Sequence, residues 1–104
     1  MNQIIIHGRL TRAPELNSFR NKEGRDTSVC RFSVAVNRNY GDEADFFNCS
    51  VFGKRAEVVD KYFCKGSEIV IKGRMESNKY KDRDGNDRIG WRIMVEGFDF
   101  CGSK

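Results

Sequence analysis

The nine residues Asp45–Gly53, with the sequence DFFNCSVFG, decide the fold, because they predict a strand with two very different faces. Successive side chains of a strand point to opposite faces. One face is apolar and suits a core: it carries Phe47, Cys49 and Val51. The other face is polar in the middle and aromatic at both ends: it carries Phe46, Asn48, Ser50 and Phe52. The two rings at its ends stand roughly 20 Å apart along an extended strand.

The mixed face of this strand indicates a binding surface. A core face would not place Asn48 and Ser50 at its centre, and a solvent face rarely carries two phenylalanines unless a partner covers them. Flat rings on a polar sheet surface suit unpaired nucleic-acid bases, which need a platform for stacking. The alternative is that Phe46 and Phe52 fill a second small core or a contact between subunits.

Composition predicts one globular domain. The chain has 104 residues, of which 38% are hydrophobic and 33% charged, and its formal net charge is +4. This length supports a single core without disulfides, and a mildly basic surface is compatible with a polyanionic partner. The four cysteines lack the spacing of zinc ligands, so we expect no metal and no other cofactor. Without a signal peptide or a long apolar run, the sequence predicts a cytoplasmic protein that does not enter a membrane.

The remaining apolar periodicity predicts four more strands and one helix. The five expected strands are Gln3–Thr11, Val29–Tyr40, Asp45–Gly53, Glu68–Tyr80 and Arg88–Phe100. Ala13–Ser28 has the composition of a turn-rich connection, and Lys54–Cys64 has a helical stripe. Gly97 predicts a bulge in the last strand. Five strands with one helix between the third and fourth form an all-β OB-fold, a partly open Greek-key barrel that binds oligonucleotides. A β-sandwich is the alternative, but it has no place for the helix.

Strand phase gathers rings and cations on or near one face of this barrel. The expected stacking rings are Tyr40, Phe46, Phe52 and Tyr80. The expected phosphate contacts are Arg9, Arg31, Arg38, Lys54, Lys72, Arg74, Lys79, Lys81 and Arg88. Rings that stack bases and cations that contact phosphates are what a single strand requires. No helix remains to enter the major groove of a duplex, because the one helix closes the barrel.

Two further residue groups predict contacts between subunits or with the core. Ile4, Ile5 and Ile6 make both faces of the first strand apolar, so a partner subunit or another part of the chain must cover one of them; we expect an oligomer interface of Ile4, Ile5, Ile6 and His7. Trp91, the single tryptophan, is in phase with Ile89 and Ile93. This phase favours a core or interface role over base stacking.

Five segments, in order, resemble the bacterial single-stranded DNA-binding proteins. They are GRLTRAPEL (Gly8–Leu16), FSVAVNRNY (Phe32–Tyr40), ADFFNCSVFGKRAEVV (Ala44–Val59), KGSEIVIKGRM (Lys65–Met75) and NKYKDRDGNDR (Asn78–Arg88), within a match from Met1 to about Gly102.

The resemblance implies a protein that coats single-stranded DNA in replication, recombination and repair, with little sequence preference, at the nucleoid. Family members usually assemble as homotetramers, and a dimer is the alternative for this chain. The resemblance also implies stacking on Tyr40, Phe46, Phe52 and Tyr80, the rings that the strand phases had selected. Many family members continue into a flexible linker and an acidic tip that recruits partner proteins. Nothing of that kind follows Phe100, either because this is a short natural form or because the tail was removed. We therefore expect one domain over residues 1–104 and assign it no recruitment through such a tip.

Three other functions remain open on the sequence. A primosomal replication protein and an RNA-binding module share the OB-fold, and a dimerisation protein would explain the apolar first strand. An enzyme is not expected, because the sequence has no Ser–His–acid set and no phosphate loop. The carboxylates of Asp42–Asp45 could hold a metal in principle, but a solvated loop is the simpler interpretation.

Overall fold

The computed structural model describes residues 1–100 of the chain, so Cys101 and the end of the matched stretch at Gly102 lie outside the described residues. It has six strands and one helix. In chain order these are β1 (Ile4–Leu10), β2 (Glu15–Arg20), β3 (Asp26–Asn37), β4 (Ala44–Phe52), α1 (Lys54–Tyr62), β5 (Glu68–Lys81) and β6 (Asp87–Phe100). Within residues 1–100, no helix is long and apolar enough to cross a membrane.

The strand β2 corrects the predicted turn-rich connection at Ala13–Ser28. It pairs antiparallel with the first half of β3, from Glu15↔Arg31 to Arg20↔Asp26. All six residues of β2 are exposed, so no alternation of buried and exposed side chains marks it in the sequence. The helix lies in the expected part of the chain. Because β2 adds one strand before it, the helix follows the fourth strand and not the third. It ends at Tyr62, two residues before the predicted Cys64, because Phe63 has extended backbone angles.

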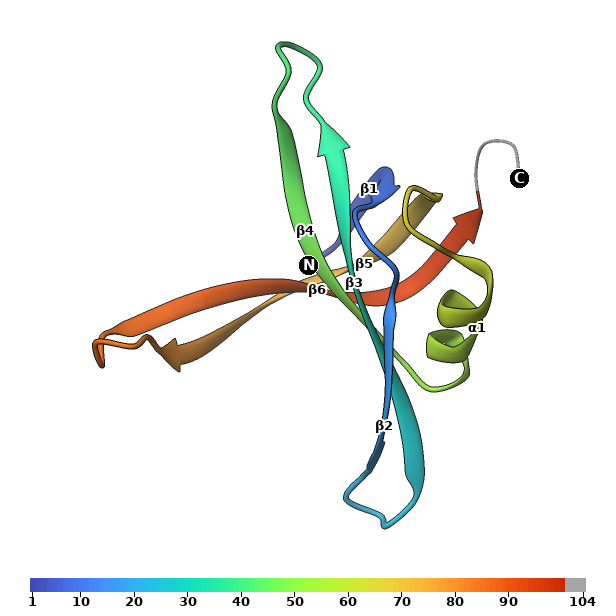
Figure 1. The fold of residues 1–104 in the computed structure, drawn as a ribbon. Coiled ribbons are helices and arrows are strands. Elements are labelled where there is room, and N and C mark those ends of the chain that lie inside the picture. Colours follow the sequence, from blue (N-terminus) through green and yellow to red (C-terminus); the bar gives the residue numbers. More distant parts are fainter. Residues whose placement is uncertain (101–104) are drawn as a thin grey trace.

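The single sheet closes into a barrel. Its order is β1-β5-β6-β4-β3-β2, and β1 pairs with β3 as well as with β5. A short parallel pairing between β4 and β6 joins the two antiparallel parts. As Figure 1 shows, three hairpin ends project from this barrel in different directions: the β2–β3 turn, the β3–β4 loop and the long β5–β6 arm. This arrangement confirms the all-β OB-fold.

The core consists of the apolar phase of each barrel strand. Phe32, Val34, Val51, Ile71 and Ile93 are nearly or fully buried there. From α1, Ala56 and Val59 are added to the same cluster. Phe63 follows the helix and stacks on Phe100, with ring centroids 4.6 Å apart.

Two thiols, Cys30 and Cys49, are buried in the core, and Cys49 lies on the strand face that the sequence predicted to be apolar. Burial raises the pKa of Cys30 to about 11 and that of Cys49 to about 12. Desolvation disfavours the thiolate, so both side chains serve as small apolar core residues.

The bulge of β6 lies one residue before the predicted Gly97. Lys72 pairs with Gly97, while Gly73 pairs with Val95, so Glu96 is the extra residue. Gly73 allows this close approach, since a Cβ there would stand 2.2 Å from the carbonyl oxygen of Met94.

Gly8 provides a test of barrel closure. A Cβ at this position would stand 2.3 Å from the backbone oxygen of Ala35, across the contact between β1 and β3. We expect Gly8→Ala to lower the free energy of unfolding by roughly 1–3 kcal/mol, the range for overpacking in a tight site, measured by urea denaturation. Gly97→Ala is the control, since a Cβ there meets nothing within 4 Å; equal stability losses in the two variants would contradict the role given to Gly8.

Candidate nucleic-acid interface

The outward faces of β3 and β4 form the centre of the candidate site. Directly opposed residues of an antiparallel pair share a face, and the register pairs Ala35 with Phe46, Arg31 with Ser50 and Val29 with Phe52. Phe46 is 69% exposed and Phe52 is 40% exposed. The alternation of exposure predicted from the sequence holds at Phe46, Asn48 and Phe52 but not at Ser50, which is buried at 4% exposure. Two exposed rings therefore flank a polar centre in which the amide is exposed and the hydroxyl is buried. That these rings stack bases stays a prediction.

The same face continues onto the β5–β6 arm and includes Tyr80. Ser50 pairs with Met94 of β6, and Arg88 and Arg92, which precede Met94 in β6, point to the same face of the strand. Tyr80 is exposed and pairs with Arg88. Register thus places Tyr80 on the same face of the sheet as Phe46 and Phe52. Tyr40, the fourth predicted ring, is exposed in the β3–β4 loop.

Phe19 is a fifth ring, and it was not predicted from the sequence. It lies on β2, contacts the edge of Phe52 with ring centroids 6.1 Å apart, and is 40% exposed. Its segment has the composition of a turn, so no strand was predicted there and Phe19 could not be assigned to a face of the sheet. The pair makes the Phe52 end of the site a two-ring corner.

A hollow lies between the two rings of β4, and its volume is about 320 Å³. Three arginines, an amide and a hydroxyl contribute the polar part of its lining, and Phe32 and Cys49 complete it; the polar residues are Arg12, Arg31, Arg92, Asn48 and Ser50. Arg31 was predicted to contact phosphate, whereas Arg12 and Arg92 were missed. The phase of Arg92 on the outward face of β6 was a signal that could have found it, but the position of Arg12 depends on barrel closure.

The structure divides the predicted phosphate contacts into paired and unpaired cations. Five of them have carboxylate partners at 2.6–3.5 Å: Arg9 with Glu68, Arg38 with Glu43 and Asp45, Arg74 with Glu76, Lys81 with Asp87, and Arg88 with Asp82. Within residues 1–100, the other four have no carboxylate within 4.0 Å: Arg31, Lys54, Lys72 and Lys79. A phosphate would have to compete with a carboxylate for the paired cations, whereas no neighbouring carboxylate of residues 1–100 offsets the charge of the unpaired ones.

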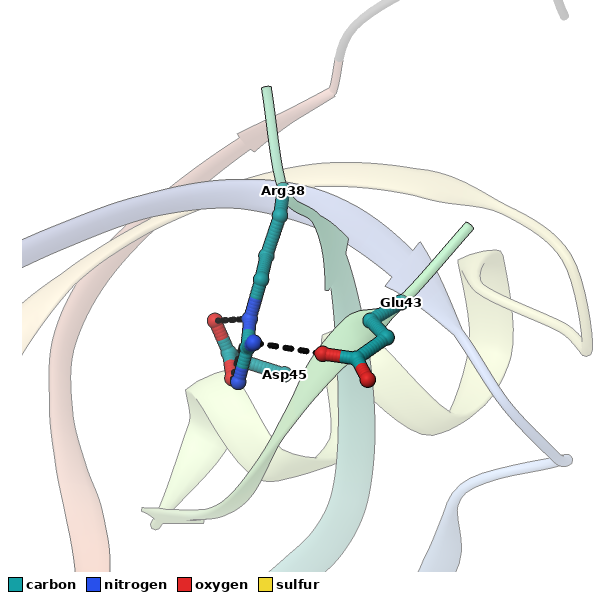
Figure 2. A network of polar contacts seen from close by, with 3 residues as sticks. All are labelled: Arg38, Glu43 and Asp45. Atoms are coloured by element: carbon teal, nitrogen blue, oxygen red, sulfur yellow. Dashed lines mark hydrogen bonds and ion pairs between the residues drawn. The ribbon is translucent and has the colours of Figure 1, made fainter. Parts of the chain in front are cut away.

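Figure 2 shows the most extensive of these ion pairs, at the base of the β3–β4 loop. Arg38 donates to Glu43 at 2.6 Å and to Asp45 at 2.9 Å. The hydrogen bond from Arg38 lowers the pKa of Asp45, and the same bond raises the pKa of Arg38. These contacts tie together the two ends of the loop that carries Tyr40. They also pair two of the acidic side chains in Asp42–Asp45 with an arginine.

The tip of the β5–β6 arm is held in a similar way. The carboxylate of Asp82 accepts hydrogen bonds from the backbone N–H groups of Asp84 and Asn86 and from the side chain of Arg88. The bond from Arg88 is the main cause of the lowered pKa of Asp82. Arg88 is therefore a structural residue of the arm as well as a predicted phosphate contact.

Trp91 is not a core residue. It is 58% exposed, and its neighbour Ile89 is exposed too, so the core interpretation of Trp91 is wrong. Trp91 pairs with Ser77, on the face of the arm opposite Tyr80. The interface and stacking interpretations of Trp91 both remain.

The first strand presents its predicted interface residues on two faces. Ile6 belongs to the core cluster of its own chain, and Ile4 packs against that cluster. Ile5 is 63% exposed on the other face. His7 shares that face, with its Nε2 3.0 Å from Glu68. An oligomer contact through β1 would therefore use the Ile5 and His7 side. No group of three metal-ligating side chains occurs within residues 1–100.

Comparison with known proteins identifies the relatives of this chain. The model of the single-strand binding protein family matches residues 1–101. A single-stranded DNA-binding protein of Clostridium perfringens is 41% identical over 104 residues, which cover 99% of this chain and 67% of the relative. One from Fusobacterium nucleatum is 35% identical, covering the whole chain and 69% of the relative. Single-stranded DNA-binding protein 1 of Clostridium acetobutylicum is 36% identical, covering the whole chain and 96% of the relative.

The Arg38 network makes a prediction about titration. In the folded protein, the carboxyl group of Asp45 should titrate below the ordinary aspartate range, because Arg38 stabilises the carboxylate. We expect Arg38→Gln to return the pKa of Asp45 toward its ordinary value, measured by NMR titration of side-chain carboxyl carbons. Asp82 is the internal control, since its partner is Arg88; an unchanged Asp45 in the variant would contradict the assignment.

Proposed function

The chain belongs to the single-strand binding protein family, and from this membership and the ring-bearing face of β3 and β4 we propose that it binds single-stranded DNA without catalysing a reaction. The protein coats and protects strands exposed in replication, recombination and repair. The observation that carries the proposal is the outward face of β4, where exposed Phe46 and Phe52 flank a polar, arginine-lined centre.

In the proposed mechanism, the affinity for a strand does not depend on its base sequence. Bases stack on Phe46, Phe52, Tyr40 and Tyr80, and stacking uses the flat face of a base, which all four bases have. The cations of the face contact phosphates, which are the same at every position of a strand. Both kinds of contact ignore base identity, so binding has little sequence preference. A duplex keeps its bases stacked on each other, so it can use only the electrostatic part of this binding.

We further propose that the functional form is a homotetramer that acts in the cytoplasm, at the nucleoid. Ile5 supports an assembly through β1, because a large exposed apolar side chain in the middle of a strand is a usual feature of a protein contact. Val70 faces the same side, next to Ile5 and His7 on the sheet, since it pairs with His7.

Replacing Phe52 by alanine tests the proposed function. We expect Phe52→Ala to weaken binding to a labelled oligo-dT of about 35 nucleotides several-fold, because one stacking platform contributes roughly 1–3 kcal/mol per base. Fluorescence anisotropy at low and moderate salt measures the affinity, with a matched duplex and oligo-U alongside. Circular dichroism and a melting curve check that the fold is retained, since Phe52 also contacts Phe19.

The control for this experiment is Tyr62→Ala, which removes an exposed ring from α1, outside the predicted stacking set. Equal affinity of wild type, Phe52→Ala and Tyr62→Ala for oligo-dT would remove the stacking role. Equal binding to duplex would mean that charge alone drives association. Tighter binding to oligo-U than to oligo-dT would favour an RNA-binding module.

The β1 surface makes a separate prediction about assembly. We expect Ile5→Glu to convert the tetramer into smaller species, because like charges would meet where apolar side chains pack, as measured by size-exclusion chromatography with light scattering. Ile89→Glu is the matched control, since Ile89 is similarly exposed but lies on the β5–β6 arm. If only Ile89→Glu disrupts the tetramer, the contact lies on the arm and not on β1.

A further inference from the structure

We propose that the hollow lined by Arg12, Arg31 and Arg92 binds an internucleotide phosphate of the strand, between the bases held on Phe46 and Phe52, and that Glu76 limits its affinity. This inference rests on the proposed function, since it assigns a phosphate site within the same face. Two of the three arginines, Arg12 and Arg92, were not predicted from the sequence to contact phosphate.

Four separate parts of the chain meet at the hollow. Arg12 comes just after β1, Arg31 from β3 and Arg92 from β6, and β4 contributes Asn48 and Ser50. The backbone N–H of Thr11 donates to the carbonyl oxygen of Ser33 at 2.9 Å. This bond fixes the chain beside Arg12 against β3, close to Arg31. The arginines are therefore brought together by the closed barrel.

The charges of the hollow are not balanced within the chain. Within residues 1–100, Arg12 and Arg31 have no carboxylate within 4.0 Å, and Arg92 has one partner, Glu76, at 3.5 Å. Three cations around a volume of about 320 Å³ repel each other, and an anion placed between them relieves that repulsion. The guanidinium group presents paired N–H donors that match phosphate oxygens. An amide and a hydroxyl beside them add neutral donors.

The position of the hollow selects the phosphate of a strand over a free anion as the ligand. Phe46 and Phe52 lie roughly 20 Å apart along β4, whereas neighbouring stacked bases are about 3.4 Å apart. The shortest path for a strand with bases on both rings therefore carries its backbone across the centre of β4. The arginine-lined hollow lies at that centre, where Asn48 and Ser50 stand.

The carboxylate of Glu76 competes with a phosphate for Arg92. One of its carboxylate oxygens is 2.7 Å from Arg74, and the other is 3.5 Å from Arg92. It pairs directly with Arg92 across β5 and β6. A phosphate in the hollow must share Arg92 with this carboxylate, so the removal of its charge should strengthen the site.

The experiment measures the salt dependence of oligo-dT binding for the double variant Arg12→Gln, Arg31→Gln. Removing one cation that binds a phosphate should reduce the slope of log affinity against log salt by about 0.7 for a single strand, so removing two should reduce it by about 1.4 per protomer engaged. The control is Arg55→Gln with Lys61→Gln on α1, which changes the net charge equally outside the hollow. Glu76→Gln should bind more tightly than wild type and show a steeper slope.

Each outcome decides the proposal. A reduced slope in the arginine variant alone, with tighter binding by Glu76→Gln, supports the phosphate site. Equal slopes for the arginine variant and the helix control, with wild-type binding intact, overturn the site and leave the proposed function standing. Unchanged or weaker binding by Glu76→Gln overturns the role given to that carboxylate. Failure of the wild type to bind oligo-dT overturns the proposed function itself.

Discussion

The rest of the structure depends on the pairing of β1 with two strands at once. β1 pairs with β5 along most of its length and with β3 at Arg9 and Leu10. The backbones of β1 and β3 approach each other so closely that position 8 has no room for a side chain. Closure at this point turns the sheet into a barrel and places the chain after β1 beside the outward face of β3. The arginine-lined hollow therefore exists only because the barrel closes.

Charge on the surface is distributed in a way that net charge does not describe. The chain carries a formal charge of +4, yet several cations of the candidate face are paired with carboxylates. Exposed pairs of this kind contribute little to stability, but they hold loops and arms in place, as Arg38 does for the β3–β4 loop. The unpaired cations are the ones that attract a polyanion without first giving up a partner. On this face, the paired arginines and lysines mainly hold loops and arms in place, whereas the unpaired ones mainly attract a polyanion.

Much of this fold could be predicted from the sequence, because alternation in a strand is a local property. It separated Phe47 and Cys49 from Phe46 and Phe52, and the structure buries the first pair more than the second. It could not find β2, whose residues are all exposed and whose pairing with β3 is the only sign of a strand. It could not bring Arg12 to Arg92 either, since their approach depends on which strands pair.

Trp91 shows the limit of alternation most clearly. Its phase is that of Ile93, and Ile93 is fully buried, yet Trp91, its nearest neighbour on that face of the strand, is 58% exposed. Phase fixes the face of a strand, but burial also requires something to cover that face. In the barrel β4 pairs with β6 at Ile93 and Met94, whereas from Asp87 to Trp91 the strand pairs only with β5, within the part of the chain that the structure describes. The inward face of the barrel therefore continues into the arm as an exposed apolar face.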